Sequence, residues 1–449
     1  MLNYIWLTLI LLSVTIGGWN DRLKDVTDGA FDGAKTAVTI SLGLIGVMAL
    51  WLGIMRLAEG AGLVQRIARG LQPIMRRLFP EVPADHPAMG SMVMNMAANM
   101  LGLGNAATPL GLRAMRDLER LNPRPGVATN AMCTFLAVNT SSVQLIPTTA
   151  IAILVAAGSK QPTAIVGTAL LATLCAATVA IISVKFLEKL PWFRIRRVTA
   201  GDATVAEAVD ADHAPEFDEA LPSPAPPPRR MPRWGVAVLA LLFLFFAALF
   251  VRLVYPPFFY LPFDAAAAAQ NPFVRGVNAL SLLAIPFLLS FFPIYAALLG
   301  LKVYDEFVEG AKEGFGVILK IIPFLVTMLV AINMFKGAGG IDLLTRALAP
   351  ILGPLHFPPD LLPLALMRPL SGSGTLAILT DIVHRLGPDN VVSLMAATVY
   401  GSTETTFYVA AVYFGSVGVK RTRHAIPAGL LADLAGVIAS VIICRAVLG

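Results

Sequence analysis

Long apolar runs separated by short polar stretches follow one another along this chain. An α-helix needs roughly 20 mainly apolar residues to cross the hydrocarbon core of a bilayer. Runs close to that length occupy residues 2–19, 37–57, 162–184, 234–251 and 426–444, and further apolar helices are predicted at 273–301 and 314–335. The pattern predicts an all-α polytopic membrane protein.

The pattern occurs twice. Phe31-Asp-Gly-Ala-Lys35 recurs as Val308-Glu-Gly-Ala-Lys312, about 277 residues later. Further on, Leu101-Gly-Leu-Gly-Asn105 corresponds to Ser371-Gly-Ser-Gly-Thr375, and the polar run 139–142 corresponds to 400–403. Duplicated apolar halves with Gly-rich and polar breaks are typical of transporters whose binding site lies between the two repeats.

Each half therefore contains the same two interrupted elements. We expect a re-entrant helical hairpin at 87–119, broken at 102–105, and a discontinuous transmembrane helix at 126–157, broken near 139–142. The second half repeats them at 359–386 and 391–415. A broken helix exposes backbone N–H and C=O groups, which are tolerated at membrane depth only where protein or a watery cavity satisfies them.

Basic residues give an orientation. In the first half they cluster at 66–77, 113–124 and 185–197. In the second half the basic loop is at 420–423, and the corresponding loop of the first half contains Lys160 alone. Because Lys and Arg concentrate on the cytoplasmic side, we expect two inverted-topology repeats with the N-terminus inside. This requires residues 21–35 to be external, although they include Arg22 and Lys24.

The segment 61–79 differs from the predicted spans, because basic and aliphatic residues alternate along it at helical pitch. Such a pattern is typical of a helix that lies on a membrane surface. We expect an amphipathic helix on the cytoplasmic surface, with Arg66, Arg69 and Arg76 opposite Leu63, Ile67, Leu71 and Ile74.

Composition agrees with this organisation. The chain is 57% hydrophobic and 14% charged, whereas a soluble domain has roughly 25% charged residues. Residues 200–232 are acidic and rich in proline, which predicts a disordered cytoplasmic linker between a first module at 1–199 and a second at 233–449. The first apolar run lacks a basic leader, so we interpret it as a retained helix of a multi-pass protein of the cytoplasmic membrane.

Neutral polar residues line the breaks of the first half. Asn95 and Asn99 lie one turn apart, on one face of their predicted helix. They could join helices through hydrogen bonds, or they could line a substrate site. The first-half candidates for substrate binding are Asn95, Asn99, Asn105, Thr108, Asn139, Thr140, Ser141, Ser142 and Gln144.

The second half contains the charged candidates. Glu404 combines a charge with a helix break, which predicts a ligand for substrate or for a coupling ion. Arg368 could bind an anion, since guanidinium binds carboxylates in bidentate fashion, or it could lie near the external surface. Asp433 is a second ion-coupling candidate, unless it pairs with Lys320. The second-half candidates for substrate binding are Arg368, Ser371, Ser373, Thr375, Ser402, Thr403, Glu404 and Thr405.

Signals for catalysis are poor. The chain has no H-E-x-x-H motif and no P-loop, and Ser371-Gly-Ser-Gly374 resembles a serine nucleophile turn without a histidine in any predicted span. Cys133, Cys175 and Cys444 fall inside apolar runs, so we expect no disulfide. We expect no enzyme activity, no metal site, and no cofactor apart from Na⁺ or H⁺ as a coupling ion.

Two stretches carry a family resemblance. Asn99-Met-Leu-Gly-Leu-Gly-Asn-Ala-Ala-Thr-Pro-Leu-Gly111 resembles bacterial spore maturation protein A. The second half, with Ser371-Gly-Ser-Gly-Thr375 and the run 401–418 that begins Gly401-Ser-Thr-Glu-Thr-Thr406, resembles spore maturation protein B. Both belong to the nucleoside recognition, or Gate, domain family, which is similar to parts of concentrative nucleoside transporters. The resemblance implies a fusion of two proteins that act together in spore core dehydration.

Together these features predict an ion-coupled secondary transporter that moves a small polar metabolite, nucleoside-like or an organic anion, by alternating access. The alternatives are a non-transporting scaffold or regulatory factor of envelope or spore maturation, and a passive channel. The expected partners are a small solute and the lipid bilayer, with a second copy of the chain if it forms a homo-oligomer. The basic residues lie beside spans, so no nucleic acid is expected.

Overall fold

The protein is described here by a computed structural model, at residues 2–102, 104–193, 231–255, 270–341, 343, 346 and 357–449. These residues form helices joined by short loops, and they contain no β-strand apart from one isolated bridge between Val127 and Arg421. Most of the predicted linker 200–232 lies outside the described residues. The prediction of an all-α protein is confirmed for the described part of the chain.

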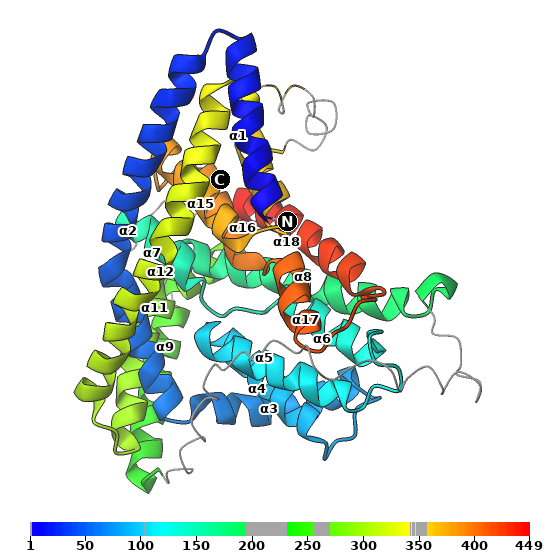
Figure 1. The fold of residues 1–449 in the computed structure, drawn as a ribbon. Helices are drawn as coiled ribbons and strands as arrows, with labels where there is room; N and C mark the ends of the chain where they lie inside the picture. The colour runs from blue at the N-terminus through cyan, green and yellow to red at the C-terminus, as the bar shows by residue number, and fades with distance from the viewer. Residues whose placement is uncertain are drawn as a thin grey trace, which may run out of the picture.

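The first half contains two hairpin helices and an interrupted helix in the predicted order (Figure 1). Its helices are α1 Leu2–Trp19, α2 Leu23–Gly60, α3 Leu63–Leu78, α4 Pro87–Met100, α5 Gly104–Glu119, α6 Asn130–Thr140, α7 Thr148–Ala156 and α8 Ile165–Leu187.

The second half follows the same order. Its helices are α9 Arg233–Val254, α11 Pro272–Leu298, α12 Val303–Gly337, α14 Leu362–Met367 after the 3₁₀ turn Pro359–Leu361, α15 Gly372–Leu386, α16 Val391–Ser402, α17 Thr406–Gly415 and α18 Ala425–Val447.

Several helices are long and apolar enough to cross a membrane. Within the described residues these are α2, α8, α9, α11 and α18, and shorter apolar helices cover Trp6–Trp19 and Leu325–Gly337. Helix α2 is longer than predicted, because its 38 residues include most of the stretch expected to be external. At 1.5 Å per residue it is about 57 Å long, so its first turns can extend beyond a hydrocarbon core of roughly 30 Å.

Helices α2 and α12 pack side by side along their length and form the tall edge of the molecule (Figure 1). Glycines allow this approach: a Cβ atom on Gly33 would lie 2.6 Å from the carbonyl oxygen of Leu329, and one on Gly310 would lie 2.5 Å from that of Leu52. Gly310 follows Gly33 by 277 residues, and Leu329 follows Leu52 by the same number. The contact is therefore made twice, with the two helices exchanging roles.

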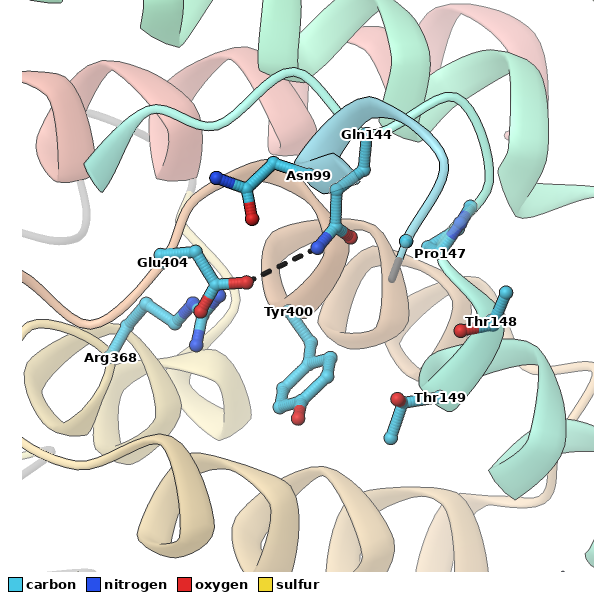
Figure 2. A pocket seen from close by; sticks show the side chains of 9 residues that line it. Asn99, Gln144, Pro147, Thr148, Thr149, Arg368, Tyr400 and Glu404 are labelled. Atoms are coloured by element: carbon cyan, nitrogen blue, oxygen red, sulfur yellow. Dashed lines mark hydrogen bonds between the residues drawn. The ribbon is translucent and has the colours of Figure 1, made fainter. Parts of the chain in front are cut away.

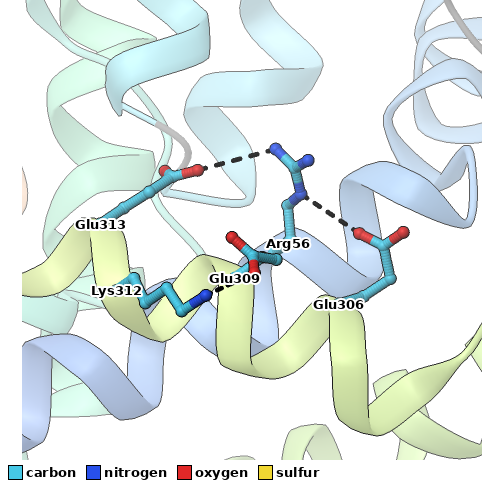
Figure 3. Close-up of polar contacts among 5 residues, drawn as sticks. All are labelled: Arg56, Glu306, Glu309, Lys312 and Glu313. Atoms are coloured by element: carbon cyan, nitrogen blue, oxygen red, sulfur yellow. Dashed lines mark hydrogen bonds and ion pairs between the residues drawn. The ribbon is translucent and has the colours of Figure 1, made fainter.

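Ion pairs add to this helix pair. Arg56 of α2 lies between two carboxylates of α12, with its Nε 3.3 Å from Glu306 and its Nη1 3.6 Å from Glu313 (Figure 3). Glu309 pairs with Lys312 along α12 itself, at 2.6 Å. These side chains are 37–65% exposed, and such pairs contribute little to stability. The close glycine contacts therefore contribute more to holding the two helices together.

The two interrupted helices run antiparallel to each other. At one end, the Ala128 amide donates to Arg421 and Gly126 accepts from the amides of Lys420 and Arg421. At the other end, Asp389 accepts from the hydroxyl of Ser159 at 2.6 Å and from the Lys160 amide. These hydrogen bonds lower the pKa of the Asp389 carboxyl. The pairing brings the break between α6 and α7 against the break between α16 and α17.

Each half also contains hairpin helices that pack against its own interrupted helix, α5 against α6 and α15 against α16. Helices α4 and α5 pack antiparallel, with Ser91 donating to Asp117 at 2.8 Å, and their tip turns at Gly102, which has a φ of 74°. Helix α3 packs against α4 with Arg66, Arg69 and Arg76 exposed, as predicted. Its buried face differs in detail, because Val64, Ala68 and Met75 are buried whereas Ile74 is 60% exposed.

Candidate solute-binding site

A polar cavity of about 160 Å³ lies where the breaks of both halves meet. Four of its lining residues were predicted from the sequence, two from each half (Figure 2). Helices that end at membrane depth leave backbone dipoles and polar side chains directed at one space. The lining residues are Asn99, Gly102, Gln144, Pro147, Thr148, Thr149, Arg368, Tyr400 and Glu404.

Glu404 lies in the break between α16 and α17, which spans only residues 403–405. Extended backbone at Thr403 ends α16, and Thr405 is the N-cap of α17. The amide of Glu404 donates to the carbonyl of Thr140 at 2.6 Å, and its carboxylate accepts from Gln144 Nε2 at 3.1 Å (Figure 2). A backbone and a side-chain bond therefore tie the break of one half to the break of the other.

Arg368 ends helix α14 and is 3% exposed. Its guanidinium lies over the ring of Tyr400, 4.9 Å from the ring centroid, and its Nε has no hydrogen-bond partner. In the described part of the chain it forms no ion pair, although it lines the same cavity as Glu404. A buried cation without a paired carboxylate is suited to receive an anionic group.

The asparagines of the first half divide between the cavity and the packing behind it. Asn99 lines the cavity and donates to Asn139 Oδ1 at 3.0 Å. Asn139 is buried and donates in turn to the Phe135 carbonyl at 2.9 Å. Asn95 is fully buried and donates to Ala107 at 2.8 Å and to the hydroxyl of Tyr413 at 3.3 Å. Asn95 and Asn139 therefore join helices through hydrogen bonds, which was the alternative to lining a substrate site.

Other candidates lie near the cavity without lining it. Ser371 caps α15 by accepting from the Gly374 amide, and Thr375 donates to the Ser371 carbonyl. Ser141 and Ser402 donate to carbonyls of their own helices. The side chain of Asn105 lies outside the described residues. The remaining candidates, Thr108, Thr140, Ser142, Ser373, Thr403 and Thr405, are described but do not line the cavity.

Five lining residues were not among the predicted site residues. Tyr400 belongs to α16 rather than to a break, because that helix continues to Ser402. Its contact with Arg368 depends on tertiary packing, and no local pattern predicts it. Pro147, Thr148 and Thr149 begin α7, where a proline before a helix start could have marked the far end of the first break. Gly102 contributes the turn at the hairpin tip.

The remaining charged candidates have different surroundings. Asp433 is 3% exposed and accepts from the Thr406 hydroxyl at 2.6 Å. The side chain of Lys320, its proposed partner, lies outside the described residues. Asp381 pairs with Arg385, one turn along the same helix, at 3.6 Å and also with Lys336 of α12 at 3.7 Å. This cluster borders a second cavity between α2, α12 and α15, away from the helix breaks.

Comparison with known proteins identifies relatives of both halves. A family model described as nucleoside recognition (Gate) matches residues 41–160 and 318–420, which contain every residue lining the first cavity. Spore maturation protein A of Bacillus subtilis (strain 168) is 49% identical over 182 residues, covering 40% of this chain and 93% of that protein. Spore maturation protein B of the same strain is 43% identical over 173 residues, covering 38% of this chain and 97% of that protein. The two relatives match separate parts of the chain, as a fusion would.

Proposed function

This chain belongs to the nucleoside recognition (Gate) family and joins the counterparts of spore maturation proteins A and B in one polypeptide, and from this we propose that it is a secondary transporter. In this proposal it carries a small polar metabolite across the cytoplasmic membrane. The solute binds in the cavity between the two halves, and alternating access moves one half against the other around it.

The single observation that carries this proposal is the cavity at the meeting point of the breaks. Its lining combines Arg368 and Glu404 with the amides of Asn99 and Gln144, all inside a chain of apolar helices. Ionisable residues within membrane helices are costly and mark substrate or ion pathways. A scaffold without a solute would gain nothing from a buried guanidinium that forms no ion pair with any described carboxylate.

The cavity also favours a class of solute. Its volume of about 160 Å³ is smaller than the roughly 300–1,000 Å³ of pockets for drug-sized ligands. Arg368 has its Nε unpartnered, whereas Glu404 is already bonded to Gln144. A small organic anion whose carboxylate binds Arg368 therefore fits better than a neutral nucleoside, and its hydroxyl or amide groups would bond Asn99 and Thr148.

Alternating access requires two halves that can exchange conformations. The doubled contact between α2 and α12, in which Gly33 and Leu52 have counterparts in Gly310 and Leu329, supports a two-fold relation between the halves. An antiparallel pair related in this way is what two inverted-topology repeats would produce. We therefore propose that the hairpins α4–α5 and α14–α15 are re-entrant and enter from opposite sides.

Flux into proteoliposomes tests this proposal. The purified chain is reconstituted and screened for counterflow of labelled lactate, succinate, glutamate, uridine and adenosine. We expect saturable flux of at least one carboxylate, and we expect R368Q and E404Q to reduce it at least tenfold. R113Q and E309Q are matched controls, because Arg113 is 61% exposed and Glu309 59% exposed.

Three outcomes would contradict the proposal. Normal flux in both R368Q and E404Q would show that the cavity is not the binding site. Flux that grows linearly with solute concentration, without saturation, would favour a passive channel. Wild-type vesicles that carry none of the tested solutes, together with a purified chain that binds none of them, would favour the scaffold or regulatory role.

A further inference from the structure

Asp433 is a buried carboxylate in which one of the two oxygens has no hydrogen-bond partner. It lies midway along α18, is 3% exposed, and accepts from the Thr406 hydroxyl through Oδ2. Its other oxygen, Oδ1, has no hydrogen-bond partner, and no described cation forms an ion pair with it, although Arg368 acts on its charge over a longer distance. A buried carboxylate without a cation in direct contact is unfavourable, so a bound cation or a proton would stabilise it.

The backbone of α18 comes unusually close to both helix breaks at this point. Gly429 and Gly436 lie four residues before and three residues after Asp433, on the same helix face. A Cβ atom on Gly429 would lie 2.9 Å from Thr406 Oγ1 and 3.4 Å from Thr140 Oγ1. One on Gly436 would lie 2.7 Å from Thr403 Cγ2, so side chains of both breaks gather around the Asp433 turn.

Unpartnered oxygens collect at the same place. Thr140 is fully buried and Thr403 is 4% exposed; the Thr140 hydroxyl has no hydrogen-bond partner, and the Thr403 hydroxyl faces Asp433 without a bond of ordinary length. Buried polar atoms in native proteins are nearly always paired, so each unpaired one requires an explanation. Asp433 Oδ1 and the two hydroxyl oxygens are all available to one ligand that accepts electron pairs. A bound cation would satisfy all three.

Helix ends of both signs meet beside Asp433. Thr140 is the last residue of α6, and α16 ends at Ser402, next to Thr403. The last carbonyls of a helix lack intrahelical partners and carry partial negative charge. The N-terminus of α17 begins at Thr406 and carries partial positive charge, and its Thr406 hydroxyl already bonds Asp433 Oδ2. Arg368 attracts the Asp433 carboxylate but forms no ion pair with it, so the two C-termini and Oδ1 remain available to a cation.

We propose that Asp433, Thr140 and Thr403 form a sodium site where the two broken helices cross. Hard cations prefer oxygen ligands, and one carboxylate among neutral oxygens balances a single positive charge rather than two. The described residues contain no cluster of three His, Cys, Asp or Glu side chains that would hold a divalent or transition metal. A proton on Asp433 would neutralise the carboxylate and could be donated in a hydrogen bond to one threonine oxygen, but it would leave the other threonine oxygen without a partner.

The sodium site deepens the proposed function, since it names the coupling ion of the same transporter. Thr403 belongs to the sodium site and the next residue, Glu404, lines the solute cavity. An ion that orders the break 403–405 fixes Glu404 and Gln144 as well, so ion and solute binding are coupled. Such coupling is reciprocal: Na⁺ should tighten solute binding by the same factor by which the solute tightens Na⁺ binding.

The test is the thermal stability of the full chain, purified in detergent, in NaCl, KCl and choline chloride at equal ionic strength. Ligand binding to the folded state raises the apparent melting temperature by mass action. We expect a saturable rise in Na⁺ of at least ~3 °C, smaller effects of K⁺, and none of choline. D433N should abolish the response to Na⁺, and T403V should shift its midpoint to at least tenfold higher concentration.

Asp117 offers a matched control, because it is 4% exposed but is already paired with Ser91 and Arg120. D117N should melt at a lower temperature and keep the full response to Na⁺. The proposal is overturned if the three salts act alike. It is also overturned if D433N keeps the Na⁺ response, or if acid pH in choline chloride raises the melting temperature of the wild type as much as Na⁺ does. If D433N does not fold, the Na⁺ midpoint of T403V tests the proposal instead, and an unchanged midpoint would overturn it.

The sodium site and the solute site can fail separately. R368Q should lose stabilisation by carboxylates but keep the response to Na⁺, because Arg368 is not one of the proposed ion ligands. A Na⁺ response without any solute flux would refute the transport proposal and leave the ion site standing. Flux that is unchanged when choline replaces Na⁺, with no effect of Na⁺ on the melting temperature, would refute the sodium site and leave the transport proposal standing.

Discussion

The contact between α2 and α12 gives the sharpest prediction for the fold. A Cβ atom on Gly33 would lie 2.6 Å from the Leu329 carbonyl oxygen and 2.9 Å from the Val330 amide nitrogen. These are backbone atoms, which cannot rotate away, so G33A must push the two helices apart by roughly 0.8 Å to reach ordinary contact. Overpacking of this kind costs about 1–3 kcal/mol.

The same helix contains a matched control. Gly46 also lies within α2, but a Cβ atom there would meet nothing within 4 Å. Alanine is a better helix former than glycine by about 1 kcal/mol, so G46A should leave the protein equally or more stable. G33A should lower the melting temperature by several degrees relative to G46A, since about 1 kcal/mol corresponds to roughly 2 °C in a large chain.

Helix α12 offers the equivalent pair of variants. Gly310 would place a Cβ atom 2.5 Å from the Leu52 carbonyl oxygen, whereas Gly316 has nothing within 4 Å. G310A should therefore lose about as much stability as G33A, and G316A should behave like G46A. The assay is thermal unfolding of the purified chain in detergent. Equal melting temperatures for the four variants would refute the close packing of α2 on α12.

Two further predictions concern residues outside this helix pair. Y413F removes a hydroxyl that contacts Asn95 and Asn139, at 3.3 Å and 3.4 Å; it should lower stability by about 1–2 kcal/mol, and an unchanged melting temperature would show that the two amides do not need it. His424 precedes α18, and burial lowers its pKa to about 4, with a smaller effect of the Arg423 charge. Because the fold keeps the imidazole neutral, stability should be full above pH 6.5, should fall between pH 6.5 and pH 4, and should then level off. H424N should flatten this dependence in pH-dependent melting curves, and a wild type that gains stability on acidification would contradict it.

The order of elements could be predicted from the sequence because burial in lipid requires apolar runs of fixed length. The helices α1, α8, α9 and α18 begin and end within three residues of the predicted runs. The start of α2, at residues 23–35, was harder to predict, because Asp25, Asp28 and Asp32 are untypical of a membrane-spanning helix. Helix propensity and the contact with α12 continue the helix through these acidic positions, which a helix of about 57 Å can place beyond a hydrocarbon core of roughly 30 Å.

The site could be predicted only where a residue is unusual for a membrane helix. Glu404, Arg368, Asn99 and Gln144 stand out by their chemistry, and all four line the cavity. Tyr400 does not stand out, because an aromatic residue in an apolar helix is ordinary until packing places Arg368 over its ring. Long-range contacts of this kind leave no local signal in the sequence.

Polarity alone also could not separate lining from packing. Asn95 and Asn99 are one turn apart and equally polar, but the first is buried against α5 and the second reaches the cavity. The position of the first break shows the same limit. Helix α6 continues through Asn139 and Thr140, and the chain unwinds only from Ser141 to Pro147. The hydroxyl-rich run predicted a break, whereas the following proline determines where the next helix begins.

The central claim is that the cavity between the two breaks holds a solute. The most direct measurement is the shift in melting temperature of the purified chain with small carboxylates and nucleosides, in the wild type and in R368Q, with R113Q as the control. The account predicts saturable stabilisation of the wild type and R113Q by at least one carboxylate, and loss of that shift in R368Q. The same shift in all three proteins, or no shift with any solute, would contradict it.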